Sequence, residues 1–473
     1  MQRRQFLKYT GSAVGGLALA ESALAKGKHT RPNILFIMTD QQSAHMMSCA
    51  GDQWLKTPAL DRLAASGIRF ERAYAANPVC VPSRFSLQTG RMPSAIRMRC
   101  NSDGQKVPDK MIRQSLGRLF KSNGYETVYG GKVHLPNRMN RLEAIGYRCL
   151  TEDARQGLAD ECVRFIKGRH EKPFLLFASF INPHDICYRA INDALQTAGK
   201  APAGNIDSKT CQNVTAKVQR KAVERLTPLP VNHAVPDGEP EAITAKYLQA
   251  MFKGVQYRKH ARDAWQEKDW RTYRDVYRRL MEMVDEKVGQ VLTALKDARL
   301  EENTLVVFTS DHGDMDGAHK LQHKSLPYEE SARIPFIMSF KGKLKAGVVD
   351  DQHLISNGLD LLPTLCDYAG IEAPKGLAGA SIRPLAEGQR VQHWRDSLVV
   401  ECQHCRMLRT DRFKYAIYDS GKNREQLIDL SNDPGEMLNL VHRAEHRDIL
   451  NRHRRLLRAW IKKTGDTIGA EYM

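Results

Sequence analysis

Short apolar runs alternate with segments of helical periodicity along most of this chain, and this alternation restricts the fold more than any other feature. The first run, residues 34–38, is followed by Thr57 and Pro58, which form an N-cap and first-turn pair. The helical pattern after them stops at Gly67, and a long amphipathic pattern over residues 273–298 leads into another apolar run. Strands that alternate with helices predict an α/β fold, with a mainly parallel sheet flanked by helices.

The chain is long enough for more than one domain. With 473 residues it exceeds the size at which a single core stops growing. Residues 26–385 carry the alternating pattern and are predicted to form a large catalytic domain. Within it, residues 188–262 lose periodicity and are rich in Pro, Lys, Arg and Asn, which indicates an insertion with substrate-binding loops. Residues 386–473 combine short strand patterns with a charged helix near 444–463 and are predicted to form a smaller C-terminal α+β subdomain.

The N-terminus has the pattern of an export signal. Arg3 and Arg4 precede an apolar run and the sequence Ala-Leu-Ala at residues 23–25, so residues 1–25 are interpreted as a twin-arginine signal peptide. We therefore expect a periplasmic or secreted protein that uses the twin-arginine export machinery. No later apolar run reaches about 18 residues, so we expect no integral membrane segment.

Composition narrows the classes of partner. The formal net charge of +18 favours anionic partners. The basic residues are scattered and no helix-turn-helix, zinc-finger or RNA-binding signature accompanies them, so we expect no nucleic acid partner. Ten cysteines are too few for a disulfide scaffold in a chain of this length. The pair Cys402 and Cys405 has the spacing of half a zinc site but no second pair, and is interpreted as structural.

Polar residues that could carry chemistry come directly after several apolar runs. In an open parallel sheet the ligand site lies at the carboxyl ends of the strands, so we expect these residues to meet at one edge. They are Asp40, Gln41, Lys132, His134, His184, Asp311 and His312. The carboxylates of Asp40 and Asp311 and the amide oxygen of Gln41 suit a hard divalent cation. We expect Ca²⁺, with Mg²⁺ or Mn²⁺ as the alternatives.

A cysteine and an arginine stand at a fixed spacing in Cys80-Val81-Pro82-Ser83-Arg84, which is followed by Thr89-Gly90-Arg91. From the residues alone, the alternative is a buried structural cysteine. The stretch resembles the signature of the type I sulfatases, of the alkaline phosphatase superfamily. That resemblance implies that a formylglycine-generating enzyme oxidises Cys80 to formylglycine, whose hydrate is the nucleophile. Gln88 departs from the leucine usual at its position.

Further motifs occur in the order of the same family. They are Asp40-Gln41, Gly131-Lys132-Val133-His134, Pro183-His184, Asp311-His312, Lys324 before Tyr328-Glu329-Glu330-Ser331, Leu408 to Tyr415, and Asp433-Pro434-Gly435-Glu436. The resemblance implies an alkaline-phosphatase-like α/β fold. It also implies a metal site formed by Asp40, Gln41, Cys80, Asp311 and His312.

The resemblance also suggests roles for the remaining residues. Lys132, His184 and Lys324 are expected to bind the substrate, with the two lysines at the sulfuryl oxygens and His184 assisting the leaving alcohol. Arg84 should position the modified cysteine. His134 should take a proton from the second hydroxyl of the hydrate, so that sulfate is expelled from the covalent intermediate.

The predicted function is hydrolysis of a sulfate ester through formylglycine and a divalent metal. A positively charged chain, export and a basic insertion favour a sulfated carbohydrate as the substrate. One alternative is a phosphonate monoester or phosphodiester hydrolase, or a choline-sulfatase-like enzyme, of the same fold. A second alternative is an inactive basic glycan-binding protein.

Overall fold

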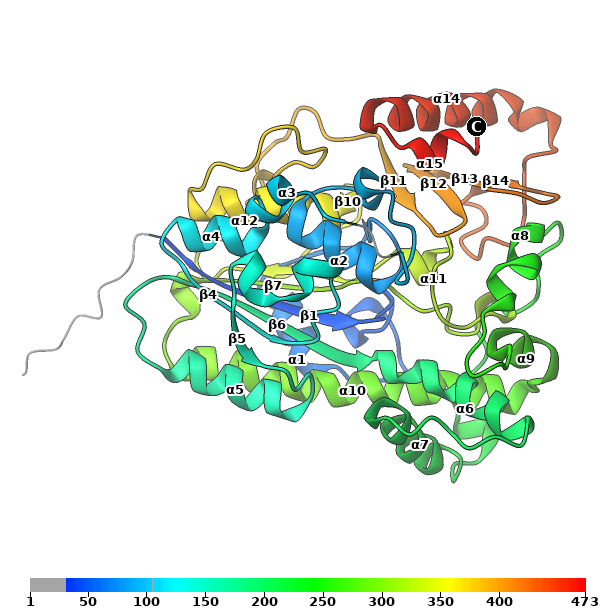
Figure 1. Ribbon diagram of the computed structural model, residues 1–473, viewed down its shortest axis with the longest axis horizontal. Helices are drawn as coiled ribbons and strands as arrows, with labels where there is room; N and C mark the ends of the chain where they lie inside the picture. Colours follow the sequence, from blue (N-terminus) through cyan, green and yellow to red (C-terminus); the bar gives the residue numbers. More distant parts are fainter. Residues whose placement is uncertain (1–30, 104–105) are drawn as a thin grey trace, which may run out of the picture.

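The computed structural model describes residues 31–103 and 106–473, so the predicted signal peptide lies outside the described residues. Within these ranges the centre is an eight-stranded sheet in the order β5-β4-β6-β1-β7-β8-β2-β9 (Figure 1). In this described sheet β8 is antiparallel to β7 and β2, and the other neighbours pair in parallel. The strands are β1 (Asn33–Asp40), β2 (Ile68–Phe70), β4 (Glu126–Gly131), β5 (Arg148–Thr151), β6 (Phe174–Pro183), β7 (Thr304–Ser310), β8 (Phe336–Ser339) and β9 (Val348–Asp350). The predicted mainly parallel sheet is confirmed.

Helices cover both faces of the sheet. One layer holds α1 (Pro58–Ala65), α5 (Gln156–Lys167) and α10 (Glu267–Asp297), and the other holds α2 (Cys80–Thr89), α4 (Leu116–Ser122) and α12 (Asn357–Ala369) (Figure 1). Along β1, Leu35 and Ile37 pack in the cluster that contains α10, whereas Phe36 and Met38 pack in the cluster that contains α12. Burial on both faces explains why this strand is a continuous apolar run.

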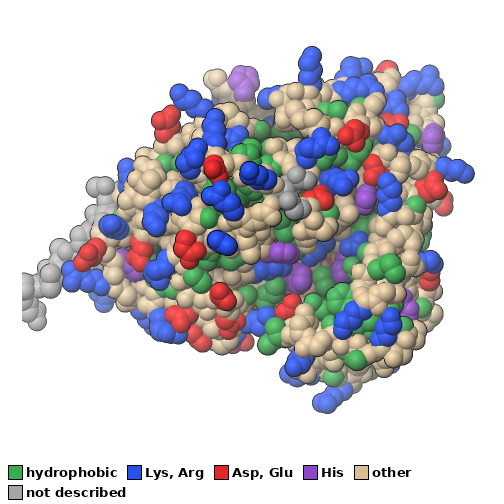
Figure 2. Space-filling model, in the orientation of Figure 1, with side chains coloured by type: hydrophobic (Ala, Val, Ile, Leu, Met, Phe, Trp, Pro, Cys, Tyr) green, Lys and Arg blue, Asp and Glu red, His purple; other side chains and the backbone are tan. Residues whose placement is uncertain are grey.

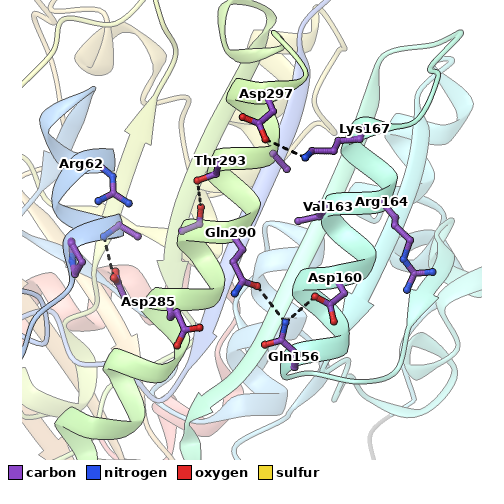
Figure 3. Close-up of a pocket in the computed structure, with 15 residues that line it drawn as sticks. Arg62, Gln156, Asp160, Val163, Arg164, Lys167, Asp285, Gln290, Thr293 and Asp297 are labelled. Atoms are coloured by element: carbon purple, nitrogen blue, oxygen red, sulfur yellow. Dashed lines mark hydrogen bonds and ion pairs between the residues drawn. The ribbon is translucent and has the colours of Figure 1, made fainter.

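The N-terminus of α1 is capped by a residue from another helix. Thr57 holds the predicted N-cap position, but its hydroxyl accepts a hydrogen bond from the backbone of Ser48 at 2.8 Å rather than from α1. The carboxylate of Asp285, on α10, accepts from the backbone N–H of Ala59 at 3.0 Å (Figure 3). It also accepts from the backbone N–H of Leu60 at 2.9 Å. A carboxylate is favourable at a helix N-terminus, so this contact also fastens α1 to α10.

The helices α1, α5 and α10 border a surface groove of about 760 Å³ (Figure 3). Acidic and basic side chains both line it, and Lys167 of α5 pairs with Asp297 of α10 at 3.1 Å. None of the predicted site residues lines this groove. Its mixed charge therefore gives no preference for an anion.

The predicted insertion is more helical than its sequence pattern indicates. Residues 188–262 include most of α6 (Cys187–Thr197), and α7 (Ile206–Val218), α8 (Glu241–Ala245) and the first part of α9 (Tyr257–Ala264). The apolar stripe of α7 is narrow, because it consists of Cys211, Val214 and Val218 among polar residues. Ion pairs supply additional contacts with the large domain, such as Lys221 with Asp275 of α10 at 2.6 Å.

The C-terminal region forms a four-stranded antiparallel sheet within the described residues. Its elements are β11 (Ser397–Glu401), β12 (Cys405–Thr410), β13 (Phe413–Tyr418) and β14 (Glu425–Asp429), followed by α14 (Arg447–Thr464) and α15 (Thr467–Ala470). Leu408 packs in one cluster with Leu457 of α14, whereas its neighbour Met407 packs in another with Leu321 and Tyr328 of the large domain. Successive side chains of β12 point to opposite faces of the sheet, so the strand packs against α14 on one face and against the large domain on the other.

Two expectations from composition can be compared with the structure. None of the described helices is both long and apolar enough to cross a membrane. All ten cysteines have free thiols. Cys402 and Cys405 are buried at the turn between β11 and β12, where the backbone N–H of Cys402 donates to the carbonyl of Cys405 at 2.9 Å. Neither belongs to a group of side chains in the described structure that could hold a metal ion.

A buried lysine fastens the C-terminal sheet to the large domain. Lys414 of β13 is 3% exposed, and its Nζ donates to the carbonyl of Pro327 at 2.9 Å. The same ammonium pairs with the carboxylates of Glu329, at 3.2 Å, and of Glu436. Glu329 also accepts from the hydroxyl of Tyr74 at 2.9 Å. These contacts satisfy buried charges that would otherwise be costly.

We predict that Lys414→Met lowers the free energy of unfolding by about 3–5 kcal/mol, because it removes the buried cation that pairs with Glu436 and Glu329, of which Glu329 keeps an ion pair with the partly exposed Arg333. Denaturant unfolding followed by circular dichroism measures the change. Lys463→Met, at an exposed position on α14, is the control and should change the stability by less than about 0.5 kcal/mol. Equal stabilities of the two variants would show that the Lys414 pairs do not hold the sheet in place.

Candidate active site

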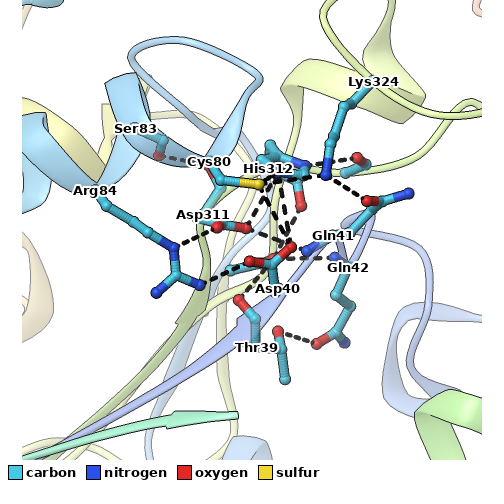
Figure 4. Close-up of polar contacts among 12 residues, drawn as sticks. Thr39, Asp40, Gln41, Gln42, Cys80, Ser83, Arg84, Asp311, His312 and Lys324 are labelled. Atoms are coloured by element: carbon cyan, nitrogen blue, oxygen red, sulfur yellow. Dashed lines mark hydrogen bonds and ion pairs between the residues drawn. The ribbon is translucent and has the colours of Figure 1, made fainter. Parts of the chain in front are cut away.

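Most of the predicted site residues meet at one end of the central sheet (Figure 4). Asp40 ends β1, Lys132 follows β4, His184 follows β6, Asp311 and His312 follow β7, Cys80 begins α2, and Lys324 lies in the loop before α11 (Glu329–Ala332). The strands β4, β6, β1 and β7 are consecutive neighbours in the sheet. Their carboxyl ends therefore open on a single edge, as the sequence predicts.

The signature residues set the limits and the orientation of α2. Pro82 stands in the first turn, where the helix requires no backbone N–H donor. Gly90 ends the helix at φ 66°, in the left-handed region that favours glycine. Cys80 and Arg84 are four residues apart and so lie on the same face, and every residue of α2 is buried. The helix thus aims both side chains at the strand ends.

Arg84 bridges the two carboxylates of the site. Its Nη2 donates to Oδ2 of Asp40 and its Nε to Oδ2 of Asp311, both at 2.8 Å. The Nη1 donates to the hydroxyl of Ser179 at 2.9 Å and to the carbonyl of Lys132 at 2.7 Å. We expected this arginine to position the modified cysteine. In the structure its hydrogen bonds hold the two carboxylates, and its position on α2 keeps it on the same helix face as Cys80. Its role toward a modified cysteine stays a prediction.

Arg84 binds the Oδ2 atoms of Asp40 and Asp311, and the Oδ1 atoms of both aspartates lie near His312. The Nε2 of His312 lies 3.6 Å from Oδ1 of Asp311 and 3.9 Å from Oδ1 of Asp40. The Sγ of Cys80 lies 3.2 Å from the same nitrogen. The Nδ1 of His312 bonds the carbonyl of Gly313 at 2.9 Å, which leaves Nε2 available as a ligand. These four buried side chains form a group that could hold a divalent metal ion.

Gln41 lies beside this group, and its side chain is shared among several partners. Its backbone N–H donates to Oδ1 of Asp311 at 3.1 Å. Its amide oxygen accepts from Nζ of Lys324 at 2.6 Å and from the thiol of Cys187 at 3.1 Å. Its amide nitrogen donates to Asp314 at 2.7 Å. The predicted ligand oxygen of Gln41 therefore also orients Lys324.

Asp314 and Cys187 were not predicted as parts of the site. Asp314 stands only three residues after Asp311, so the same strand end could have indicated it. The hydroxyl of Tyr273 donates to Asp314 at 2.8 Å, and burial raises the pKa of this carboxyl to about 6. No sequence signal links Cys187 to Gln41, because the two are 146 residues apart and meet only through the fold.

Two lysines flank the sulfur of Cys80. The Nζ of Lys132 lies 2.6 Å from Asp40 and 3.8 Å from Sγ, and the Nζ of Lys324 lies 3.3 Å from Sγ. Burial and the charge of Asp40 raise the pKa of the thiol, but Lys132, Lys324 and His312 together hold this pKa well below its ordinary value. The site therefore stabilises negative charge at the position of Cys80.

The two predicted catalytic histidines have different surroundings. His184 is partly exposed, its Nδ1 is buried without a hydrogen-bond partner, and burial, Lys132 and Lys324 hold its pKa well below the usual range. The ring is therefore neutral at neutral pH. His134 is exposed, and no hydrogen bond or ion pair of the described residues joins it to the Cys80 group. Figure 2 shows histidine side chains gathered in a hollow of this face of the molecule.

Comparisons with known proteins agree with this geometry. The family profile described as sulfatase matches residues 32–371, and the profile of the C-terminal part of N-sulphoglucosamine sulphohydrolase matches residues 317–463. A Delta 4,5-hexuronate-2-O-sulfatase of Bacteroides thetaiotaomicron is 30% identical, over 95% of this chain and 92% of its own length. The solved structure of a 2-O GAG sulfatase has a TM-score of 0.78 and 29% identity, and covers 93% of this chain and 94% of its own.

The fold also occurs with another activity. A phosphonate monoester hydrolase of Agrobacterium radiobacter has a TM-score of 0.71 but only 21% identity, with coverage of 92% of this chain and 96% of its own. This likeness extends to the fold alone. The match of the sulfatase profile over most of the chain, and the relatives at about 30% identity, are more specific. The chain therefore belongs to the sulfatase family and is a sulfuric ester hydrolase.

Proposed function

We propose that this protein hydrolyses sulfate esters on carbohydrates, with formylglycine at position 80 as the nucleophile and one divalent metal ion. The observation that carries the proposal is the position of Cys80, between two lysines and against a buried group of Asp40, Asp311 and His312. The names of the relatives, a hexuronate sulfatase and a GAG sulfatase, support a sulfated sugar as the substrate.

The metal site would be held by Asp40, Asp311 and His312, with the modified side chain at position 80 and the Gln41 oxygen beside them. When bound, the ion supplies positive charge that polarises the sulfuryl oxygens. Ca²⁺ is the proposed ion, because three of the donor groups offer oxygen, and Mg²⁺ and Mn²⁺ are the alternatives.

The lysines supply the remaining charge for the sulfuryl group. Lys132 and Lys324 approach the position of Cys80 from two different loops, so both ammonium groups would face a sulfate bound there. Charge that is positioned in advance stabilises the negative charge that develops as the sulfur–oxygen bond breaks. Lys324 is oriented by Gln41, and Lys132 by Asp40, so neither ammonium must be ordered when the substrate binds.

His184 is the proposed donor to the leaving alcohol. Burial and the two lysines keep it neutral in the free enzyme. A bound sulfate ester brings a negative charge that offsets these lysines, and so raises the affinity of His184 for a proton. The proposed role of His134, as the acceptor from the second hydroxyl, requires its exposed ring to rotate toward position 80.

Steps before catalysis are also part of the proposal. Residues 1–25, which lie outside the described structure, would direct the chain to the twin-arginine machinery and to the periplasm or the exterior. A formylglycine-generating enzyme would modify Cys80. Because every residue of α2 is buried in the folded chain, this modification would precede complete folding or require local opening of the helix.

The rival functions are less well supported than a carbohydrate sulfatase. A phosphonate monoester hydrolase shares the fold at low identity, and an inactive binding protein would not require a buried nucleophile between two lysines. Relative rates on nitrophenyl sulfate and nitrophenyl phenylphosphonate decide between the two hydrolases. A faster reaction on the phosphonate would overturn the proposal.

For the nucleophile, we predict that Cys80→Ala removes essentially all turnover of nitrophenyl sulfate, because the charged groups that remain have no covalent acceptor. Cys149→Ser, which changes an exposed thiol, should retain full turnover. In protein from the native host, mass spectrometry of the peptide with Cys80 should detect the aldehyde. An active enzyme that carries only the thiol at position 80 would rule out this mechanism.

For the metal, Asp311→Asn is expected to reduce both the bound divalent metal and the turnover, since it removes one charge from the ligand group while the shape of the side chain is kept. Elemental analysis of purified protein measures the metal, and Asp351→Asn, at an exposed position, is the control. Chelation of the parent enzyme should abolish activity, and Ca²⁺ should restore it better than Zn²⁺. Full activity of verified metal-free protein would contradict the proposal.

For the leaving group, His184→Ala should slow hydrolysis of a sugar sulfate by about 100-fold or more, but that of nitrophenyl sulfate much less. The physical reason is that nitrophenolate departs without a proton, whereas a sugar alkoxide does not. Steady-state kinetics on both substrates give the comparison, with His393→Ala, at an exposed position, as the control. An equal loss on both substrates would assign His184 to sulfate binding rather than to proton donation.

A further inference from the structure

The insertion contains an arginine that pairs with no carboxylate of the described residues. Arg258 is the second residue of α9, and its Nη1 donates to the carbonyl of Tyr247 at 3.2 Å. Its guanidinium lies over the Tyr247 ring, 4.1 Å from the ring centroid. Its Nε is buried without a hydrogen-bond partner, and the structure pairs it with none of the described carboxylates.

The other basic side chains of α9 pair with carboxylates of the chain. Lys259, the next residue, pairs with Asp263. Arg262, one turn further along α9, pairs with Glu239 at 2.9 Å. A partly buried guanidinium without an anion loses hydration and gains no charge partner in return. Arg258 is thus available to an anion from outside the chain.

Contacts of α9 place its first turn against the loop that carries Lys324. The ring of Tyr257 lies 4.9 Å from the ring of His323, between centroids. His323 directly precedes Lys324, whose Nζ is 3.3 Å from the sulfur of Cys80. The start of α9 therefore borders the loop that presents Lys324 to the substrate.

His323, which contacts Tyr257 and directly precedes Lys324, is a neutral group in this region. It is 3% exposed, has a left-handed φ of 68°, and its Nε2 is buried without a hydrogen-bond partner. Burial and the charges of Arg258, Lys324 and His184 hold the pKa of its imidazole well below the usual range. A neutral ring nitrogen beside the reacting group suits a hydroxyl of a sugar.

We propose that Arg258 binds a second anionic group on the sulfated sugar, so that the enzyme prefers sugar sulfates that also carry a carboxylate or another sulfate. The proposal rests on the proposed carbohydrate sulfatase function. A planar guanidinium offers paired donors that match either group, and the neighbouring aromatic face of Tyr257 can pack on a sugar ring. Lys132 and Lys324 remain for the sulfate that is cleaved.

The test compares sugars that differ in their second anion. The panel contains a 2-O-sulfated hexuronate disaccharide, its carboxyl-reduced derivative, glucosamine 2-N,6-O-disulfate and N-acetylglucosamine 6-sulfate. The parent enzyme should have a kcat/KM on its preferred doubly anionic sugar at least about 10-fold above that on the singly anionic sugars. Arg258→Met should lower that value by about 10- to 100-fold, through KM, and so remove the preference. Arg258→Lys, which keeps the charge without the fork, should give an intermediate value.

The control is Lys259→Met, which neutralises an adjacent cation of α9 and should keep the preference for doubly anionic sugars. If the preference depends on the carboxyl group, the parent enzyme and Arg258→Met should have the same kcat/KM on the carboxyl-reduced disaccharide. If it depends on the second sulfate, the disulfated glucosamine alone shows the effect of Arg258→Met. A parent enzyme that hydrolyses singly anionic sugars equally well overturns the inference. The inference is also overturned if Arg258→Met lowers kcat/KM on all four sugars by the same factor.

Failure of the proposed function gives a different result. An enzyme that hydrolyses nitrophenyl sulfate but none of the four sugars overturns the carbohydrate substrate itself, and with it the role of Arg258. Circular dichroism of each variant, compared with that of Lys259→Met, shows whether a loss of activity comes from the site or from unfolding.

Discussion

The bridge of Arg84 to Asp40 and Asp311 is the interaction on which the remainder of the site depends. Both carboxylates are fully buried, and they come from the ends of two neighbouring strands. Without a shared cation, their repulsion and their loss of hydration would separate the strand ends or keep one of them protonated. By occupying one oxygen of each, Arg84 turns the other oxygens toward His312 and the position of Cys80. The same arginine fixes α2, and therefore Cys80, against the sheet.

The charges of the site then explain why it suits an anionic substrate. Arg84, Lys132 and Lys324 bring three cations to the two carboxylates, before any metal is counted. The excess positive charge lies within the site, where Lys132 and Lys324 are 3.8 and 3.3 Å from the sulfur of Cys80. The net charge of +18 of the whole chain has a lesser part in this, since charges such as Lys221 are already paired within the protein.

The loop that carries Lys324 is held by three parts of the molecule. The large domain contributes Gln41, which accepts from the lysine. The insertion contributes Tyr257, packed on His323, and the C-terminal sheet contributes Met407, in the same apolar cluster as Leu321. The position of the Lys324 ammonium therefore depends on elements that are far apart in the sequence. The insertion and the C-terminal sheet therefore both support the loop that carries Lys324.

The sequence by itself determined the α/β architecture, the edge of the sheet that carries the site, and the Cys80 signature, because strand and helix periods and strand-end positions are local properties of a chain. It also indicated a C-terminal region with strands. Only the tertiary structure decided that Arg84 bridges the two carboxylates, that Cys187 meets Gln41, and that His134 is exposed. It also showed that much of the insertion is helical and that Arg258 pairs with none of the carboxylates within 31–103 and 106–473. Such features depend on which loops meet across long sequence separations, and no local pattern encodes those contacts.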